Sequence, residues 1–175
     1  MDIETINPKN ILLVEDDSRD VELTLAALEE HHLAQRVAVV EDGAEALDYL
    51  FRRGKFKMRA GGDPIVVLLD NKMPKVNGLE VLKTMKADEH LKVIPVVALT
   101  SSREVPDLTE FYKHGVNAYV VKPMNPPDFV KAVNQIGMFW ALINEPPPPT
   151  AREELSTTSS VDIIAWSEEM EPALR

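Results

Sequence analysis

Four short apolar runs in this sequence are each followed by side chains that could take part in phosphoryl transfer. The runs 11–14, 65–69, 94–99 and 118–121 end respectively at Glu15-Asp16-Asp17, Asp70, Thr100-Ser101 and Lys122-Pro123. If the runs are parallel strands, the residues that follow them meet at one edge of the sheet, where sites form in open α/β folds. Carboxylates gathered there repel one another, and a hard divalent cation such as Mg²⁺, which prefers oxygen ligands, relieves that repulsion. The sequence therefore predicts a magnesium site at this edge.

Asp70 stands alone after its run, which makes it a candidate nucleophile. A carboxylate can attack phosphorus and become an aspartyl phosphate. Mg²⁺ and Lys122 would offset the charge of the transferring group, and the Thr100 hydroxyl could bond one of its oxygens. Taken one at a time, these residues have ordinary explanations, since Asp17 or Ser18 could cap a helix and a lysine is usually solvated. Their coincidence at four strand ends favours the site.

Helical patterns alternate with the apolar runs, to which a weaker run at 37–40 is added. The runs are apolar nearly throughout and rich in Val and Ile, as strands buried on both faces of a parallel sheet are. Helix starts are indicated by Asp42 with Glu45, Asn77 with Glu80, Ser101 with Glu104, and Asn125 before two prolines. Parallel strands need crossover helices, which cover both faces of the sheet. The predicted fold is α/β: a single flavodoxin-like, doubly wound, five-stranded parallel sheet in the order 2-1-3-4-5.

The composition indicates one acidic domain followed by a tail. The chain has 175 residues, a formal charge of −10 and no cysteine, which excludes disulfides and thiolate catalysis. The net acidity argues against nucleic-acid binding. No apolar stretch is long enough to span a membrane, and the start lacks the features of a signal peptide, so we expect a cytoplasmic protein without membrane contact. The predicted domain covers 8–144, and 145–175 is predicted to be a proline-rich linker with an acidic extension. The basic, glycine-containing segment 52–64 is predicted to be a mobile surface loop.

The motifs ILLVEDD, VVLLDNKMPKVNGLEVL, IPVVALTSS and AYVVKP, in this order, resemble those of the receiver domain of two-component response regulators. The resemblance implies that Asp16 binds Mg²⁺ directly and that Glu15 acts mainly through water. Its other implied roles are Asp70 as phosphoacceptor and metal ligand, the Lys72 backbone carbonyl as metal ligand, Thr100 and Tyr119 as switch residues, and Lys122 as the phosphate-binding lysine. The Lys122–Pro123 bond is similar to one that is cis in receivers.

The function implied by the resemblance is that of a stand-alone response regulator in a phosphorelay. A sensor histidine kinase would donate a phosphoryl group from phosphohistidine to Asp70, and the phosphorylated domain would signal by protein–protein contacts. Such a protein is not an enzyme in the ordinary sense, because it catalyses only its own phosphorylation and slow dephosphorylation. The ending FWALI, the basic loop and the phrase LDNKMPKVNGLEVLK are similar to those of response regulators that partner bacterial phytochromes, which implies a light-sensing kinase.

The run 138–143 is apolar on all sides. A terminal helix cannot bury every face against its own sheet, and an exposed apolar patch usually marks an interface. We therefore expect a homodimer whose interface includes Met138, Phe139, Trp140, Leu142 and Ile143.

Other functions on the same fold have specific requirements. A Mg²⁺-dependent phosphohydrolase with an aspartyl nucleophile needs a second acid two residues after Asp70, where Lys72 stands. A flavin carrier needs a phosphate-binding loop after the first strand, and the acids at 15–17 would repel a phosphate. A receiver that serves only as a docking module would not need its intact Asp16, Thr100 and Lys122.

Overall fold

The computed structural model describes residues 10–147, which form a five-stranded parallel sheet in the order β2-β1-β3-β4-β5. The strands are β1 (Ile11–Val14), β2 (Val37–Val40), β3 (Val66–Leu69), β4 (Val96–Thr100) and β5 (Ala118–Val121). The α-helices are α1 (Ser18–Glu29), α2 (Gly43–Leu50), α3 (Gly78–Ala87), α4 (Val105–Lys113) and α5 (Pro126–Gly137). Shorter helical segments are η1 (Ala34–Arg36), η2 (Gly54–Phe56) and η3 (Met138–Ile143). The predicted fold class and strand order are confirmed.

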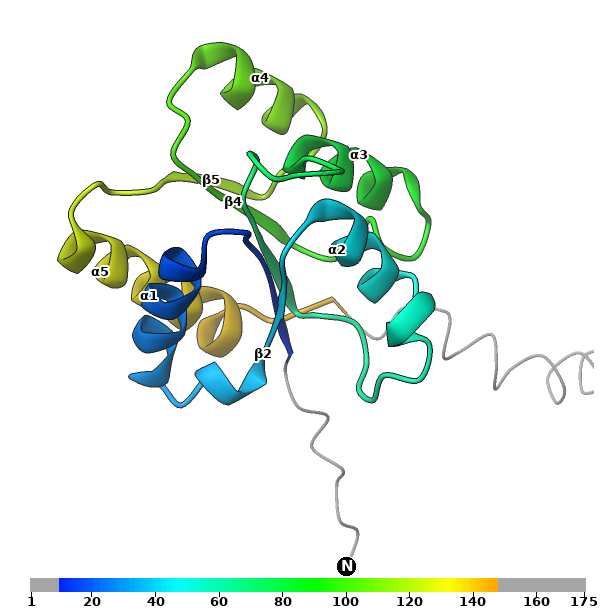
Figure 1. The fold of residues 1–175 in the computed structure, drawn as a ribbon, viewed down its shortest axis with the longest axis horizontal. Helices are drawn as coiled ribbons and strands as arrows, with labels where there is room; N and C mark the ends of the chain where they lie inside the picture. Colours follow the sequence, from blue (N-terminus) through cyan, green and yellow to red (C-terminus); the bar gives the residue numbers. More distant parts are fainter. Residues whose placement is uncertain (1–9, 148–175) are drawn as a thin grey trace, which may run out of the picture.

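The helices cover both faces of the sheet, as shown by α1 and α5 on one side and α2, α3 and α4 on the other (Figure 1). Successive side chains of a strand point to opposite faces, so each strand contributes to two hydrophobic cores. Leu13 of β1 and Leu68 of β3 pack with Leu28 of α1 and Val133 of α5. The other core joins the remaining strand residues to the second helix layer, with members such as Leu12, Leu69, Leu50, Leu82 and Phe111. Because both faces are buried, the central strands are apolar at nearly every position.

Three of the predicted capping signals begin helices in the structure. Asp42 accepts a hydrogen bond from the backbone of Glu45 at the start of α2, and Asn125 precedes the two prolines that open α5. Asn77 and Glu80 form a complete capping box at the start of α3. These caps fix where the chain leaves each loop at the carboxyl edge of the sheet.

The predicted start of α4 is wrong. The helix begins at Val105 after Glu104, which makes no side-chain cap, whereas Ser101 was expected to cap it. The loop instead uses Ser102, whose hydroxyl donates to Asp107 and accepts from the Glu104 backbone. Pro106 in the first turn needs no hydrogen-bond acceptor for its nitrogen, which favours the later start.

Arg59 attaches segment 52–64 to the end of α2, and Arg52 bonds the backbone within the segment. The Arg59 guanidinium lies 4.2 Å from the Tyr49 ring centroid and donates to the carbonyls of Tyr49 and Gly62. Arg52 donates to the carbonyls of Arg59 and Gly61. Two of the basic side chains that suggested a mobile surface loop therefore bond backbone carbonyls, and Arg53 and Lys55 pair with acids of α2.

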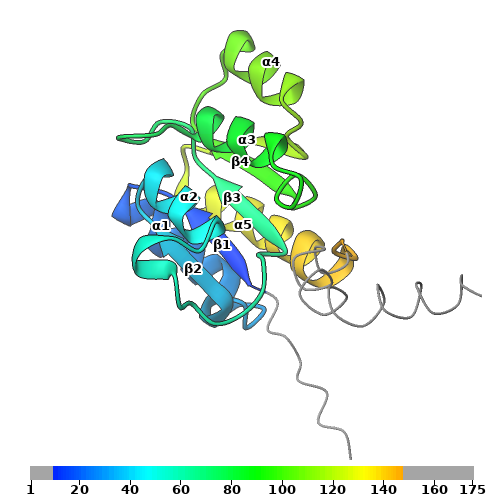
Figure 2. The ribbon, with the colours of Figure 1, turned by 90° about the vertical axis from the view of Figure 1, so that its right-hand side faces the viewer.

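The last helical segment, η3, continues directly from α5 (Figure 2). Residues 8 and 9 of the predicted domain, and 148–175 of the predicted linker and extension, lie outside the described residues. Within residues 10–147, no helix is long and apolar enough to cross a membrane.

Candidate functional site

The residues that follow the strands meet at the carboxyl edge of the sheet. Parallel register aligns Val14 of β1 with Leu69 of β3, so Glu15 and Asp70 emerge side by side. Carboxylate oxygens of Glu15, Asp16 and Asp70 all lie within 4.8 Å of one another. Glu15 and Asp70 are buried, whereas Asp16 is exposed. The predicted convergence of the acids is confirmed, and we call these three residues the acidic cluster.

Lys122 reaches into the acidic cluster from the end of β5. Its Nζ lies 2.5 Å from Glu15 Oε2 and 3.7 Å from Asp70 Oδ1. A third contact, of 2.8 Å to Asp20 Oδ2, comes from the first turn of α1. One buried ammonium therefore faces three carboxylates, two of which belong to the acidic cluster.

Burial and the Lys122 ammonium act in opposite directions on the pKa values of Glu15 and Asp70. Burial raises the pKa of Glu15 to about 7, although the hydrogen bond and charge of Lys122 act to lower it. Burial also raises the pKa of Asp70, against the attraction of Lys122. For Lys122 burial acts to lower the pKa, but its hydrogen bonds to Asp20 and Glu15 outweigh burial and raise the pKa. The site thus holds more acid than one lysine neutralises, which suits it to a cation.

Thr100 ends β4 with its side chain fully buried beside Asp70. The Thr100 side chain acts to lower the pKa of Asp70, but burial, which raises this pKa, is the larger influence. The Thr100 hydroxyl also lies 3.4 Å from the backbone nitrogen of Ser102, which donates to it. Tyr119 on the neighbouring β5 donates to the Ser102 carbonyl at 3.1 Å, and its ring packs edge-on against Phe111 at 5.5 Å. The two predicted switch residues therefore contact the same loop after β4.

The loop after Asp70 is fixed by two glycines. A Cβ on Gly78 would lie 2.1 Å from the Asp70 carbonyl oxygen, and a Cβ on Gly43 would lie 2.0 Å from the Val76 carbonyl oxygen. Asn71 accepts hydrogen bonds from the backbone of Gly78 and Leu79. This packing allows the chain to turn tightly beside the acidic cluster, where only residues without a side chain fit at 43 and 78.

The sequence of the described domain matches the response regulator receiver domain over residues 11–134. The chain belongs to this family. The match spans every element that carries the acidic cluster, Thr100 and Lys122. The fold and the positions of these side chains agree with membership of the receiver-domain family.

Three relatives of this receiver are response regulators, and two of them are named as phytochrome response regulators. Response regulator Rcp1 of Synechocystis sp. is 36% identical over 140 residues, covering 80% of this chain and 94% of its own length. The bacteriophytochrome response regulator AtBRR is 60% identical, covers 78% of this chain and 98% of its own, and superposes with a TM-score of 0.62. The phosphorylated cyanobacterial phytochrome response regulator RcpA is 36% identical with a TM-score of 0.75, covering 80% of this chain and 99% of its own. The Mn²⁺-bound form of Rcp1 is 35% identical with the same TM-score, covering 81% and 100%. This receiver is therefore related to phytochrome response regulators.

The oxygen donors of the acidic cluster fit a hard divalent cation. Three carboxylates on adjacent strand ends supply the ligand type that Mg²⁺ and Mn²⁺ accept. Lys72 lies two residues after Asp70 with an exposed side chain. The contribution of its backbone carbonyl to the metal stays a prediction.

Cation affinity should depend on pH through Glu15. With its pKa near 7, Glu15 is largely protonated below that pH. It must lose this proton before its carboxylate can interact with a cation. We expect Mg²⁺ affinity to level off above about pH 7.5 and to fall by up to about tenfold for each pH unit below 7. Calorimetric titration between roughly pH 6 and pH 8 measures the change.

Glu15→Gln provides the control for this pH dependence. The variant should bind Mg²⁺ more weakly, with an affinity nearly constant over the same pH range. An affinity of the unsubstituted protein that does not change across this range would contradict a raised pKa at Glu15.

The predicted cis bond between Lys122 and Pro123 is wrong, because residues 10–147 contain no cis peptide bond. The trans form is intrinsically preferred before proline by about 0.5–1 kcal/mol. In the trans chain Lys122 already reaches both Glu15 and Asp20, so these contacts do not require the cis form.

Sequence reasoning missed Asp20, Ser102 and the two glycines. Asp20 carried one signal, an acid in the first turn of the helix that follows the acidic strand end. The same helix begins after Asp17, whose side chain accepts from the backbone of Arg19 and Asp20, so Asp17 is a capping residue. Gly43 and Gly78 are required because another part of the backbone passes close to each of them, and Ser102 because of its hydrogen bonds within the loop, none of which the residue types alone reveal.

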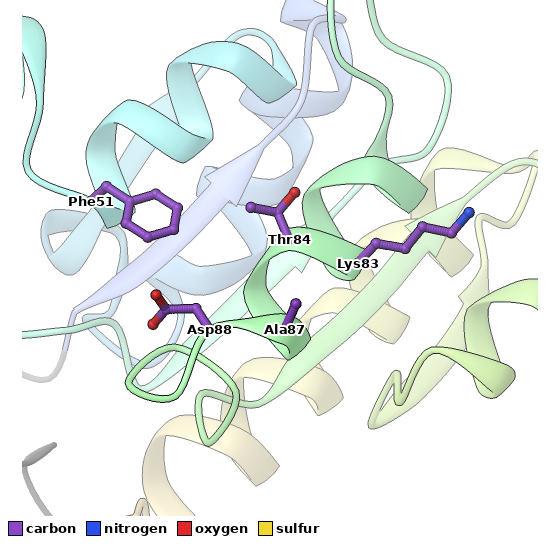
Figure 3. A pocket seen from close by; sticks show the side chains of 5 residues that line it. All are labelled: Phe51, Lys83, Thr84, Ala87 and Asp88. Carbon is purple, nitrogen blue, oxygen red and sulfur yellow. The ribbon is translucent and has the colours of Figure 1, made fainter.

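A shallow groove lies away from the acidic cluster, between the ends of α2 and α3 (Figure 3). It is lined by Phe51, Lys83, Thr84, Ala87 and Asp88. No residue of the acidic cluster lines this groove, so we do not connect it with the chemistry of Asp70.

Proposed function

We propose that Asp70 accepts a phosphoryl group from a phosphohistidine of a sensor histidine kinase. The observation that carries the proposal is the buried Asp70 carboxylate, which lies beside Glu15 and Asp16 and 3.7 Å from the Lys122 ammonium. An Asp70 oxygen forms the new P–O bond, the donor P–N bond breaks, and its electron pair stays on the imidazole nitrogen, which takes up a proton. Mg²⁺ would be held by Glu15, Asp16, Asp70 and the Lys72 carbonyl. When bound, it supplies charge neutralisation for the phosphoryl oxygens.

The side chains around Asp70 have complementary parts in this transfer. Lys122 offsets the charge of the phosphoryl group, and Thr100 donates its hydroxyl to one phosphoryl oxygen. Burial of Asp70 makes the pocket accessible to few water molecules and strengthens these interactions. The protein is a phosphoacceptor that assists its own phosphorylation and slow dephosphorylation rather than an enzyme that turns over a substrate.

The output is a shift between two conformations. The acyl phosphate brings about −2 charge. Thr100 moves toward it and pulls on the loop that contains Ser102, whose carbonyl accepts from Tyr119. Tyr119 then turns into the space that Thr100 leaves, and the surface of α4, β5 and α5 changes shape. A preference of only a few kcal/mol for this state is enough to switch most molecules.

The kinase partner that we infer is a bacterial phytochrome. The support is the similarity to AtBRR and RcpA, which are named as a bacteriophytochrome and a cyanobacterial phytochrome response regulator. A cytoplasmic location is part of this proposal, because the kinase uses ATP. The alternative of a Mg²⁺-dependent phosphohydrolase has no observation in its favour, since Lys72 stands where that reaction needs a second acid.

The test of the proposed function is a phosphotransfer profile. Purified autophosphorylated histidine kinases, with a bacterial phytochrome among them, are mixed with the receiver, and loss of label from each kinase is followed over time. We expect rapid transfer from the phytochrome and slow transfer from the others. Transfer from none of the kinases would refute the phosphoacceptor role, and equal transfer from all of them would refute the phytochrome assignment.

We also propose a homodimer formed through η3. Four of its apolar side chains are exposed, with Ile143 at 65% and Leu142 at 51%, and Met138 and Phe139 exposed to lesser degrees. Trp140, by contrast, packs partly against the core that contains α1 and α5, so its part in the interface is smaller than the sequence predicted. Covering this patch would remove apolar surface from water.

Replacing Phe139 and Leu142 together by glutamate should convert the dimer to a monomer. Two buried charges at an apolar interface cost far more than the interface gains. Sedimentation velocity at tens of micromolar measures the change. Met58→Glu, at an exposed position on the η2 side, should leave the sedimentation unchanged. A monomer for the unsubstituted protein, with and without beryllofluoride, would contradict the dimer.

A further inference from the structure

Lys122 pairs with two carboxylates in different surroundings, those of Glu15 and Asp20, which we call its anchors. Glu15 belongs to the acidic cluster and is deeply buried, whereas Asp20 is outside the cluster, on the first turn of α1, with a quarter of its side chain exposed. The Lys122 Nζ is at hydrogen-bond distance from both anchors but lies 3.7 Å from Asp70 Oδ1. A charge-assisted hydrogen bond is usually about 2.7–2.9 Å long, so the ammonium is bound to the anchors rather than to the acceptor.

Asp20 is fixed in place independently of the acidic cluster. Its backbone nitrogen donates to the Asp17 side chain, which caps α1, and the helix is packed against α5 through Leu28. The positive end of the helix dipole favours a negative charge at this position. A cation that draws Glu15 away from Lys122 would leave the contact between Asp20 and Lys122 intact.

We propose that Asp20 is a positioning residue that restrains the Lys122 ammonium and limits how readily it passes to a phosphoryl group on Asp70. The inference rests on the proposed phosphoacceptor function. Glu15 and Asp20 accept two of the three N–H donors of the ammonium and hold its nitrogen 3.7 Å from Asp70 Oδ1, so the attraction of Asp20 opposes movement of the ammonium toward the phosphoryl oxygens. Loss of the Asp20 charge therefore makes Lys122 more available, and formation of the phosphorylated state becomes easier.

The expected effect is a gain rather than a loss. Asp20→Asn should speed phosphorylation by phosphoramidate about threefold to tenfold, the range for one partly exposed charged contact. It should tighten the binding of beryllofluoride, a phosphoryl mimic, by the same factor. In the phosphoramidate reaction an Asp70 oxygen bonds to phosphorus, the P–N bond breaks, and the leaving nitrogen takes a proton from solvent.

The experiment compares three variants in the full chain with Mg²⁺ present. Asp128→Asn is the matched control, because Asp128 is also an acid in the first turn of a helix, α5. The ion pairs of Lys122 are made with other carboxylates, among them those of Glu15 and Asp20. Asp20→Glu keeps the charge and should stay close to the unsubstituted rate. Initial rates are followed by intact-protein mass spectrometry, beryllofluoride affinity by fluorine NMR, and thermal unfolding shows that every variant is folded.

A double substitution separates restraint of Lys122 from a simple charge effect. In a Lys122→Gln background, Asp20→Asn should give no further gain in rate or affinity. No gain, or a loss, from Asp20→Asn alone overturns the inference, as does an equal gain in the Lys122→Gln background or from Asp128→Asn. If the unsubstituted protein neither takes up the phosphoryl group nor binds beryllofluoride, the proposed function itself fails, and the inference fails with it.

Discussion

Asp70→Asn should abolish phosphorylation by any donor. The amide is not a nucleophile toward phosphorus at neutral pH, and it also removes one charge from the acidic cluster. Among residues 10–147, Asp70 is a buried acid that lies within the acidic cluster and contacts Lys122. We expect label transfer to fall by at least a thousandfold, to the limit of detection, as measured with a phosphorylated kinase or with phosphoramidate.

The matched control for Asp70→Asn is Asp128→Asn, which makes the same chemical change at an exposed position. This variant should be phosphorylated at the rate of the unsubstituted protein. Both variants should unfold cooperatively. Substantial labelling of the Asp70→Asn protein would mean that another residue accepts the phosphoryl group.

Gly78→Ala should destabilise the fold although alanine is the better helix former. A methyl group at this position would lie 2.1 Å from the Asp70 carbonyl oxygen and 2.9 Å from the Asn71 Cα, both of them backbone atoms that cannot rotate away. Overpacking of this kind costs about 1–3 kcal/mol or more, which exceeds the helix preference for alanine. We expect the free energy of unfolding to fall by at least about 2 kcal/mol in urea titrations.

Gly62→Ala is the control for this prediction. Gly62 lies in the loop held by Arg59, and its φ is not positive, so alanine meets no left-handed backbone strain there. The free energy of unfolding of the Gly62→Ala protein should differ from that of the unsubstituted protein by no more than about 0.5 kcal/mol. Equal effects of the two substitutions would contradict the close approach between α3 and the backbone at Asp70.

The fold could be predicted because its signals are local. Strands buried on both faces are apolar throughout, and the helix starts at Asp42, Asn77 and Asn125 are set by a side chain and a backbone nitrogen only a few residues apart. Alternation of strands and helices then permits few topologies. The convergence of Glu15, Asp70 and Lys122 follows directly from parallel strands.

The errors and omissions concern contacts between distant segments. Asp20 contacts Lys122 across 102 positions of sequence, and its spacing from the other acids does not reveal this. The start of α4 is an exception, because it depends on local hydrogen bonds of Ser102 to Asp107 and Glu104, and the adjacent Ser101 offered the same kind of hydroxyl. Arg52 and Arg59 were indistinguishable in sequence from solvated arginines, because their acceptors are backbone carbonyls.

The phosphoryl group should be attached to the Asp70 carboxylate, and borohydride reduction tests this directly. Reduction of an aspartyl phosphate converts that residue to homoserine, which peptide mass spectrometry locates after phosphotransfer. We predict homoserine at position 70 and at no other acid of the acidic cluster. Homoserine at Asp16 or Asp20, or a phosphate on a hydroxyl or imidazole that survives reduction, would contradict the account.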